Sequence, residues 1–276
     1  MLYNPKRNLA FIHIPKNAGQ AVRKALSEAE PISYASFASD MKVDEARAEA
    51  LMEEGTAFPD IGLVQPEHLP LAFLKSHFPD SWQVLTGAKS FILVRTPRDR
   101  FLSALMQRLR EYGGAGAIRA DDPLVAREAH HVCTWLDGRG AFCDKEYIHF
   151  SRQVDYADCD GERIVSAIFP LDRTDAAAAW VEAETGLAID VTHDHARREP
   201  KGWARSLQPA ARFIGRNLMP LPLKRAIYPL WTKSAVFANA SKRYKTVDLG
   251  ADVERFIADY YAADAAMYEE ASKSLA

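Results

Sequence analysis

Cysteine is scarce in this sequence of 276 residues, with only Cys133, Cys143 and Cys159 present. An odd number of cysteines without a CxxC pair fits neither a disulfide framework nor a four-ligand zinc site. The simplest setting for three isolated thiols is a reducing compartment. We therefore expect a cytoplasmic protein.

Long hydrophobic runs are also lacking near the N-terminus. Lys6 and Arg7 stand beside a short apolar segment, and polar residues follow it. A signal peptide or a membrane-spanning helix needs a much longer apolar stretch. We therefore expect no transmembrane segment.

A surplus of positive charge is missing as well, since 35 Lys and Arg residues are balanced by 37 Asp and Glu residues. We therefore expect no nucleic acid partner, and any anion site must be built locally. The hydrophobic share of 48% and the charged share of 26% are typical of a soluble globular chain. Because no repeat or low-complexity linker divides the sequence, we expect one domain over residues 1–276.

The first recognisable unit is a strand, a tight turn and a helix. Residues 9–14 are mostly apolar and stop at Pro15, which is typical of a short strand buried on both faces. After the turn, apolar residues recur at helical spacing, and this pattern predicts a helix that begins near Gly19.

A second unit of the same kind follows further along the chain. Residues 91–94 are apolar and predict a strand, residues 95–99 form a turn, and a helix follows with apolar side chains on one face. Asp99 is placed to cap that helix.

The rest of the chain continues this alternation of strands and helices. We expect, in order, a surface helix at 39–54, a strand at 62–64, a strand at 167–169, a helix at 175–184 and a final helix at 253–267. Strands that alternate with helices favour an α/β fold with a mostly parallel central sheet and helices on both faces.

Residues 201–233 break the alternation, because several prolines stand there among basic and aromatic residues. We expect an irregular basic arm or lid that could gather an anionic or sugar-rich acceptor, with Trp203 and Trp231 as stacking surfaces. A solvated basic face is the simpler alternative, and peripheral membrane contact of residues 219–231 is another. The prolines argue against one long amphipathic helix.

The turn of the first unit has the composition of an anion cradle. A helix that begins after a parallel strand presents unpaired N–H groups and the positive end of its dipole. Gly19 permits close approach of a ligand, Lys16 adds a cation, and Asn17 and Gln20 can donate side-chain amides. Unlike the P-loop of nucleotide triphosphatases, this turn has its lysine before the glycine and no metal-binding hydroxyl after it.

The two turns together resemble a known pair of motifs. Residues 11–19 (Phe-Ile-His-Ile-Pro-Lys-Asn-Ala-Gly) resemble the 5′-phosphosulfate loop of carbohydrate sulfotransferases related to the heparan 2-O and chondroitin enzymes. Residues 94–103 (Val-Arg-Thr-Pro-Arg-Asp-Arg-Phe-Leu-Ser) resemble the 3′-phosphate motif of the same family. The resemblance implies a P-loop-like three-layer sandwich that binds 3′-phosphoadenosine 5′-phosphosulfate. It further implies in-line transfer of the sulfuryl group to a hydroxyl of a saccharide or glycolipid-type acceptor, with no metal.

The resemblance also implies roles for particular residues. Lys16 should stabilise the bridging oxygen of the phosphosulfate, and Arg95 and Ser103 should hold the 3′-phosphate. The other expected donor-binding residues surround the lysine and are Pro15, Asn17, Ala18, Gly19 and Gln20.

The expected catalytic base is a histidine ahead of the second motif. Residues 67–70 (Glu-His-Leu-Pro) resemble the family's segment, and His68 is the candidate, since an imidazole titrates near neutrality. Glu67, His77 and the doublet at 130–131 stay open as alternatives. His13 is expected to pack or to orient the loop, and residues 193–195 (His-Asp-His) to form a polar loop.

The sequence departs from the family pattern in one place near the first loop. Gln20 and Ala21 stand where hydroxyl residues commonly follow the glycine. A non-catalytic nucleotide- or glycan-binding module on the same scaffold is therefore the alternative function. Further along, residues 150–153 and 261–264 retain only a scattered likeness and carry no assigned role.

Overall fold

The computed structural model describes residues 1–112, 122–191, 198–200, 237–239 and 247–275. The chain divides into two compact units, Met1–Thr192 with Asp248–Ala276, and His193–Val247. In the second unit, β9 (Arg198–Pro200) pairs antiparallel with β10 (Phe237–Asn239). The expected arm at 201–233 and the cluster at 193–195 lie outside the described residues.

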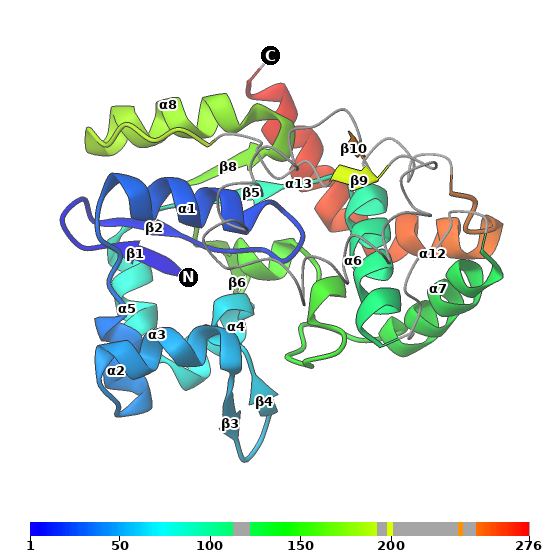
Figure 1. Ribbon diagram of the computed structural model, residues 1–276, viewed down its shortest axis with the longest axis horizontal. Coiled ribbons are helices and arrows are strands. Elements are labelled where there is room, and N and C mark those ends of the chain that lie inside the picture. Colours follow the sequence, from blue (N-terminus) through cyan, green and yellow to red (C-terminus); the bar gives the residue numbers. More distant parts are fainter. Residues whose placement is uncertain (113–121, 192–197, 201–236, 240–246, 276) are drawn as a thin grey trace, which may run out of the picture. The chain divides into compact units, whose positions relative to one another are not determined.

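The larger unit is built on a four-stranded sheet in the order β1-β2-β5-β8 (Figure 1). The strands are β1 (Leu2–Asn4), β2 (Leu9–Phe11), β5 (Lys89–Val94) and β8 (Ala167–Pro170). The last three are parallel, and β1 is antiparallel to β2. The prediction of an α/β protein with a mostly parallel sheet is therefore confirmed, with β1 as an antiparallel edge strand that the sequence did not indicate.

A helix follows each parallel strand. These helices are α1 (Gly19–Ala29), α6 (Pro97–Glu111) and α8 (Thr174–Thr185). Pro97 occupies the first position of α6, where its missing N–H is not needed. Gly186 ends α8 with a φ of 69°, a left-handed conformation that glycine adopts without a steric penalty.

Two groups of further elements complete the larger unit. Between α1 and β5 lie α2 (Ala35–Met41), α3 (Glu45–Glu54), the hairpin β3 (Thr56–Phe58) with β4 (Gly62–Val64), the short turn η1 (Pro66–His68), α4 (Leu71–His77) and α5 (Pro79–Gly87). After α6 come α7 (Pro123–Leu136), η2 (Ile148–Phe150), η3 (Val154–Tyr156), the hairpin β6 (Asp158–Cys159) with β7 (Glu162–Arg163), η4 (Leu171–Arg173) between β8 and α8, then α12 (Ala251–Tyr260) and α13 (Ala262–Lys273).

Aromatic side chains form the centre of the core. Phe11 of β2 and Phe91 of β5 are register partners with ring centroids 5.0 Å apart. Trp180 of α8 lies 6.0 Å from the rings of both Phe91 and Phe169. All residues of β2, and all of β5 except Lys89, are buried, so the sheet is covered on both faces at these strands.

Several predicted boundaries were wrong. The first strand ends at Phe11, so His13 lies in the turn and not inside a strand. The expected helix at 39–54 is two helices, because Lys42 adopts a left-handed conformation and Asp44 caps a new helix by accepting from Arg47 N. Asp99 does not cap α6, which begins two residues earlier after Thr96.

The C-terminal helix also differs from its prediction. The apolar pattern over residues 253–267 is shared by α12 and α13, which meet at Tyr261. The strand at 62–64 does form, but in a separate hairpin and not in the main sheet. The helix at 175–184 and the strand at 167–169 are confirmed to within one residue at each end. None of the described helices combines the length and the apolar composition needed to cross a bilayer.

Candidate functional site

The turn between β2 and α1 has an unusual backbone. Lys16 has a φ of 73° and Ala18 a φ of 57°, and both values lie in the left-handed region that residues with a Cβ rarely adopt. Such conformations cost on the order of 1–3 kcal/mol each and are concentrated at functional sites. The turn is therefore held in a particular shape by its surroundings, although neither residue is a glycine.

Gly19 sets how closely this turn approaches a histidine. A Cβ placed on Gly19 would lie 1.8 Å from Cδ2 and Nε2 of His13. Both residues are buried. Only glycine fits where α1 begins, because the imidazole of His13 fills the space that any side chain would need.

The second turn joins β5 to α6. Arg95 is partly exposed, and no carboxylate of the described residues lies within 4 Å of its guanidinium. Burial lowers the pKa of Arg95 from its ordinary value, while the charge of Asp99 acts in the opposite direction. Ser103, also partly exposed, lies two helical turns after the start of α6.

Hydrogen bonds place the two turns side by side. Asn17 donates from Nδ2 to Gln153 Oε1 at 2.7 Å, and the backbone N–H of Arg95 donates to the same oxygen at 2.9 Å. Arg100 donates from Nε to the Pro15 carbonyl at 3.1 Å. Lys16 of the first turn donates to Gln107 of α6. The strands that lead into the two turns, β2 and β5, are adjacent and parallel.

Two buried polar atoms beneath these turns lack a hydrogen-bond partner among the described residues. They are Oδ1 of Asn17, which is 1% exposed, and Nη2 of Arg100, which is 2% exposed. A buried guanidinium is costly unless it is paired. The surroundings of Arg100 are therefore suited to a further acceptor.

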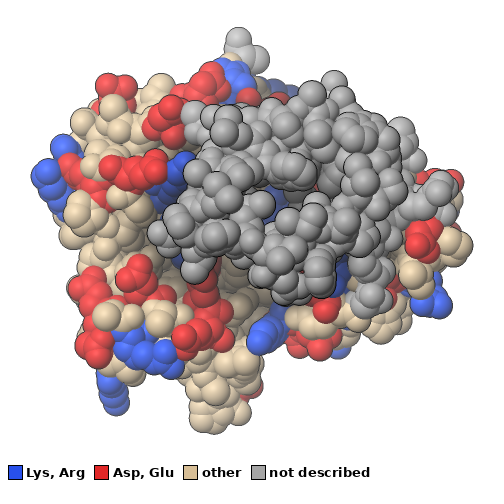
Figure 2. Space-filling model, in the orientation of Figure 1, with Lys and Arg blue, Asp and Glu red and all other residues tan. Residues whose placement is uncertain are grey.

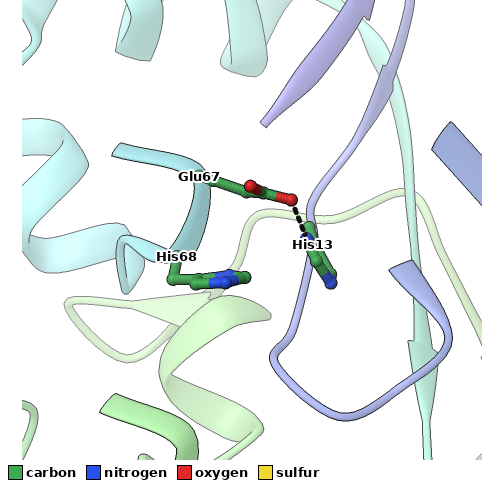
Figure 3. Close-up of side chains that lie close together, drawn as sticks. All are labelled: His13, Glu67 and His68. Carbon is green, nitrogen blue, oxygen red and sulfur yellow. Dashed lines mark hydrogen bonds and ion pairs between the residues drawn. The ribbon is translucent and has the colours of Figure 1, made fainter. Parts of the chain in front are cut away.

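A second group of side chains lies next to the first turn: His13, Glu67 and His68 (Figure 3). His13 Nδ1 and Glu67 Oε1 are 2.7 Å apart, and both residues are buried. The rings of His13 and His68 meet edge to face with centroids 4.6 Å apart. The turn η1 thus presents the predicted base and its neighbouring carboxylate to the strand end that carries the lysine.

The protonation of the buried pair follows from its surroundings. Burial raises the pKa of Glu67, but the hydrogen bond that Glu67 accepts from His13 and the charge of Arg23 act in the opposite direction, and the pKa falls below its ordinary value. Burial lowers the pKa of His13, against the effect of Glu67. Glu67 is therefore an ionised acceptor and His13 a neutral imidazole that donates from Nδ1.

His68 is also held neutral. Burial lowers its pKa well below the ordinary value of 6.5, and the neighbouring imidazoles of His13 and His149 act in the same direction. The ring remains partly exposed, but its Nδ1 is sealed from solvent without a hydrogen-bond partner among the described residues. His149 of η2 lies with its ring centroid 5.8 Å from that of His68. Burial and the charge of Lys16 lower the pKa of His149 to about 4.

Within the described residues, these three side chains form a group that could meet a metal ion, since one ligand atom from each lies within 4.8 Å of the others. The charge around them is less suitable. Arg23 Nη2 lies 3.3 Å from Glu67 Oε1, the oxygen that already accepts from His13. A cation at this point would compete with the Arg23 guanidinium for the carboxylate, so the donor set fits proton transfer better than metal binding.

The remaining predicted residues are arranged as follows. Pro15 is buried and accepts from Arg100, and Ala18 precedes α1. Gln20 is exposed, and its Nε2 lies 3.4 Å from Glu67 Oε1. Its amide thus contacts the carboxylate next to the predicted base.

The alternative histidines are engaged elsewhere. His77 of α4 pairs with Asp60 at 2.9 Å, and His131 of α7 hydrogen bonds to the Tyr147 hydroxyl at 2.8 Å. His130 is exposed on α7. The structure brings none of these three into the group around His68.

Sequence reasoning missed three residues of this region: Arg100, His149 and Gln153. Arg100 lies inside the quoted second motif, yet it was given no role there. Gln153 ends the segment 150–153, whose scattered likeness was the only available signal, and nothing in the sequence marks His149.

Positive and negative side chains are interspersed over the described part of the face shown in Figure 2. Comparisons of the chain with protein-family models, with curated proteins and with solved structures found no match. A functional proposal accordingly rests on the chemistry of the site.

Proposed function

We propose that this chain is a sulfotransferase that moves the sulfuryl group of 3′-phosphoadenosine 5′-phosphosulfate to a hydroxyl of a carbohydrate or glycolipid-type acceptor. The observation that carries the proposal is the placement of two strand-to-helix turns on adjacent parallel strands, joined through Gln153. One turn supplies Lys16 and a helix start, and the other supplies Arg95 and a second helix start. A nucleotide with phosphate groups at both the 3′ and the 5′ position matches this arrangement.

The architecture and location belong to the same proposal. A P-loop-like three-layer sandwich, with helices on both faces of the sheet, accounts for strands buried on both sides. A cytoplasmic location is in keeping with the three cysteines, which are free thiols.

The proposed reaction is an in-line displacement at sulfur. The acceptor oxygen forms a bond to sulfur as the bond from sulfur to the bridging oxygen breaks, and 3′,5′-bisphosphate leaves. Lys16 neutralises the charge that grows on the bridging oxygen. His68 takes the proton of the acceptor hydroxyl, and a neutral imidazole is the form that can do so.

His68 gives the reaction a defined dependence on pH. A base acts only when it is unprotonated, so activity is present above its pKa and is lost as the pH falls through it. Because burial moves the pKa of His68 well below 6.5, the acidic limb of kcat/KM is expected well below pH 6.5. We expect His68→Ala to remove that limb and to lower kcat about 10²–10⁴-fold. A limb that survives in His68→Ala would assign the base to another group.

Arg95 is expected to serve the 3′-phosphate. Arg95→Ala should weaken binding of adenosine 3′,5′-bisphosphate by about 10- to 100-fold, since hydrogen bonds to charged groups contribute about 1.5–3 kcal/mol. Binding of adenosine 5′-monophosphate should stay unchanged. Calorimetric titration of both nucleotides measures the effect, with the exposed Arg127→Ala on α7 as the matched control. If Arg95→Ala lowered the affinity for both nucleotides equally, Arg95 would not be the residue that contacts the 3′-phosphate.

A non-catalytic binding module is the second candidate, and Gln20 favours it. Its amide contacts Glu67, next to the predicted base, and it stands where a hydroxyl residue is expected. Such a module would bind bisphosphate or glycan without releasing bisphosphate from the donor. Labelled-sulfate transfer onto a panel of saccharides and glycolipids distinguishes the two, because sustained acceptor-dependent turnover excludes a module.

A further inference from the structure

Gln153 joins the two turns through a single buried amide. Its Oε1 accepts from Asn17 Nδ2 and from the N–H of Arg95, and its Nε2 donates to the Arg95 carbonyl at 2.8 Å. Its side chain is 0% exposed. Asn17 also donates to the Leu93 carbonyl at 2.7 Å, at the end of β5. The amide therefore fixes a side chain of the first turn to the backbone of the second.

The position of Gln153 is set from a third part of the chain. Asp264 of α13 accepts from the backbone N–H of Gln153 at 2.8 Å and from that of Val154 at 3.0 Å. Asp264 is 0% exposed. Nearby, the Tyr261 hydroxyl donates to the Phe150 carbonyl at 2.6 Å. Neither turn alone determines where Gln153 lies, so it can act as a fixed spacer between them.

We infer that Gln153 is a positioning residue that makes the site select nucleotides phosphorylated at both the 3′ and the 5′ position. This inference rests on the proposed function. A ligand that bridges two anion sites gains additional binding free energy from the second site only when the distance between the two sites is fixed before the ligand binds. A nucleotide with one phosphate needs one turn. Gln153 therefore contributes to the preference for a bisphosphate and not to the binding of either phosphate by itself.

The test compares three nucleotides on the full chain by calorimetry: adenosine 3′,5′-bisphosphate, adenosine 5′-monophosphate and adenosine 3′-monophosphate. In Gln153→Leu, which keeps the volume but removes the hydrogen bonds, we expect bisphosphate binding to weaken about tenfold. Both monophosphates should bind as they do to the wild type. The ratio of monophosphate to bisphosphate Kd is thus the readout, and a loss of stability alone does not move it.

Two further variants complete the design. Asp264→Asn keeps one acceptor oxygen and should shift the ratio in the same direction by a smaller factor. Leu85→Ala, a buried change on α5, should lower the melting temperature and leave the ratio unchanged.

The outcomes separate this inference from the proposed function. An unchanged ratio in Gln153→Leu and Asp264→Asn, or equal weakening of all three nucleotides, would overturn the role of Gln153, whereas bisphosphate binding by the wild type would still support the proposed donor site. A wild type that binds none of the three would overturn both.

Discussion

Lys16→Ala is expected to lower the rate of sulfuryl transfer about 10²–10³-fold, the usual effect of removing one group that stabilises charge in a transition state. The ammonium of Lys16 donates to Gln107 in the C-terminal part of α6, and the left-handed backbone at Lys16 sets the direction in which its side chain leaves the turn. Binding of bisphosphate should weaken less than turnover, because the charge on the bridging oxygen is largest in the transition state. Single-turnover release of labelled sulfate measures the effect.

The matched control for this prediction is Lys24→Ala. Lys24 lies on the exposed side of α1, where its only ion pair within the described chain is a long one of 3.9 Å to Glu28. Such surface pairs contribute little, so the control should retain both stability and turnover. If both lysine variants lost activity equally, or if Lys16→Ala kept normal turnover, Lys16 would not stabilise the leaving group.

Gly19→Ala is expected to have the largest effect on stability. The new Cβ would overlap the ring of His13, which is buried and bonded to Glu67, so the ring must move or α1 must shift. Forcing extra volume into a packed interior costs about 1–3 kcal/mol, which corresponds to a fall in melting temperature of about 5 °C for a unit of this size. Thermal unfolding measures the change.

A double-mutant cycle identifies the cause. If the clash with His13 destabilises Gly19→Ala, the pair His13→Ala and Gly19→Ala should be clearly less destabilised than the sum of the two single changes. Gly140→Ala is the control, because a Cβ at Gly140 meets nothing within 4 Å. Additive effects at positions 13 and 19 would contradict the packing argument.

The two strand-turn-helix units were predictable because the signals that define them are local. An apolar run stops at Pro15, and helical spacing resumes at Gly19, so strand and helix are read from neighbouring residues. The helix break at Lys42 was missed because a polar, Ala- and Glu-rich composition continues across it, and the break at Tyr261 was missed because the apolar spacing continues across it. His13 was placed in a strand for the same reason, since Ile12 and Ile14 beside it are apolar.

The link between the two turns could not be predicted. Asn17 and Gln153 are separated by 136 positions, and Gln153 and Asp264 by 111. A glutamine and an aspartate without local periodicity carry no sign of such partners, because the contacts are created by the packing of α13 near the sheet. The grouping of His13 with Glu67 and His68 arises in the same way, from the placement of η1 beside the end of β2.

The hydrogen bonds that Asp264 accepts have a consequence for biosynthesis. The turns that carry Lys16 and Arg95 are translated first, yet Gln153 between them is anchored by α13, which follows much later in the chain. A nascent chain still attached to the ribosome before Asp264 emerges would carry both turns without a fixed separation. Under the proposed function, competence to hold the donor would therefore arise only after α13 has been made.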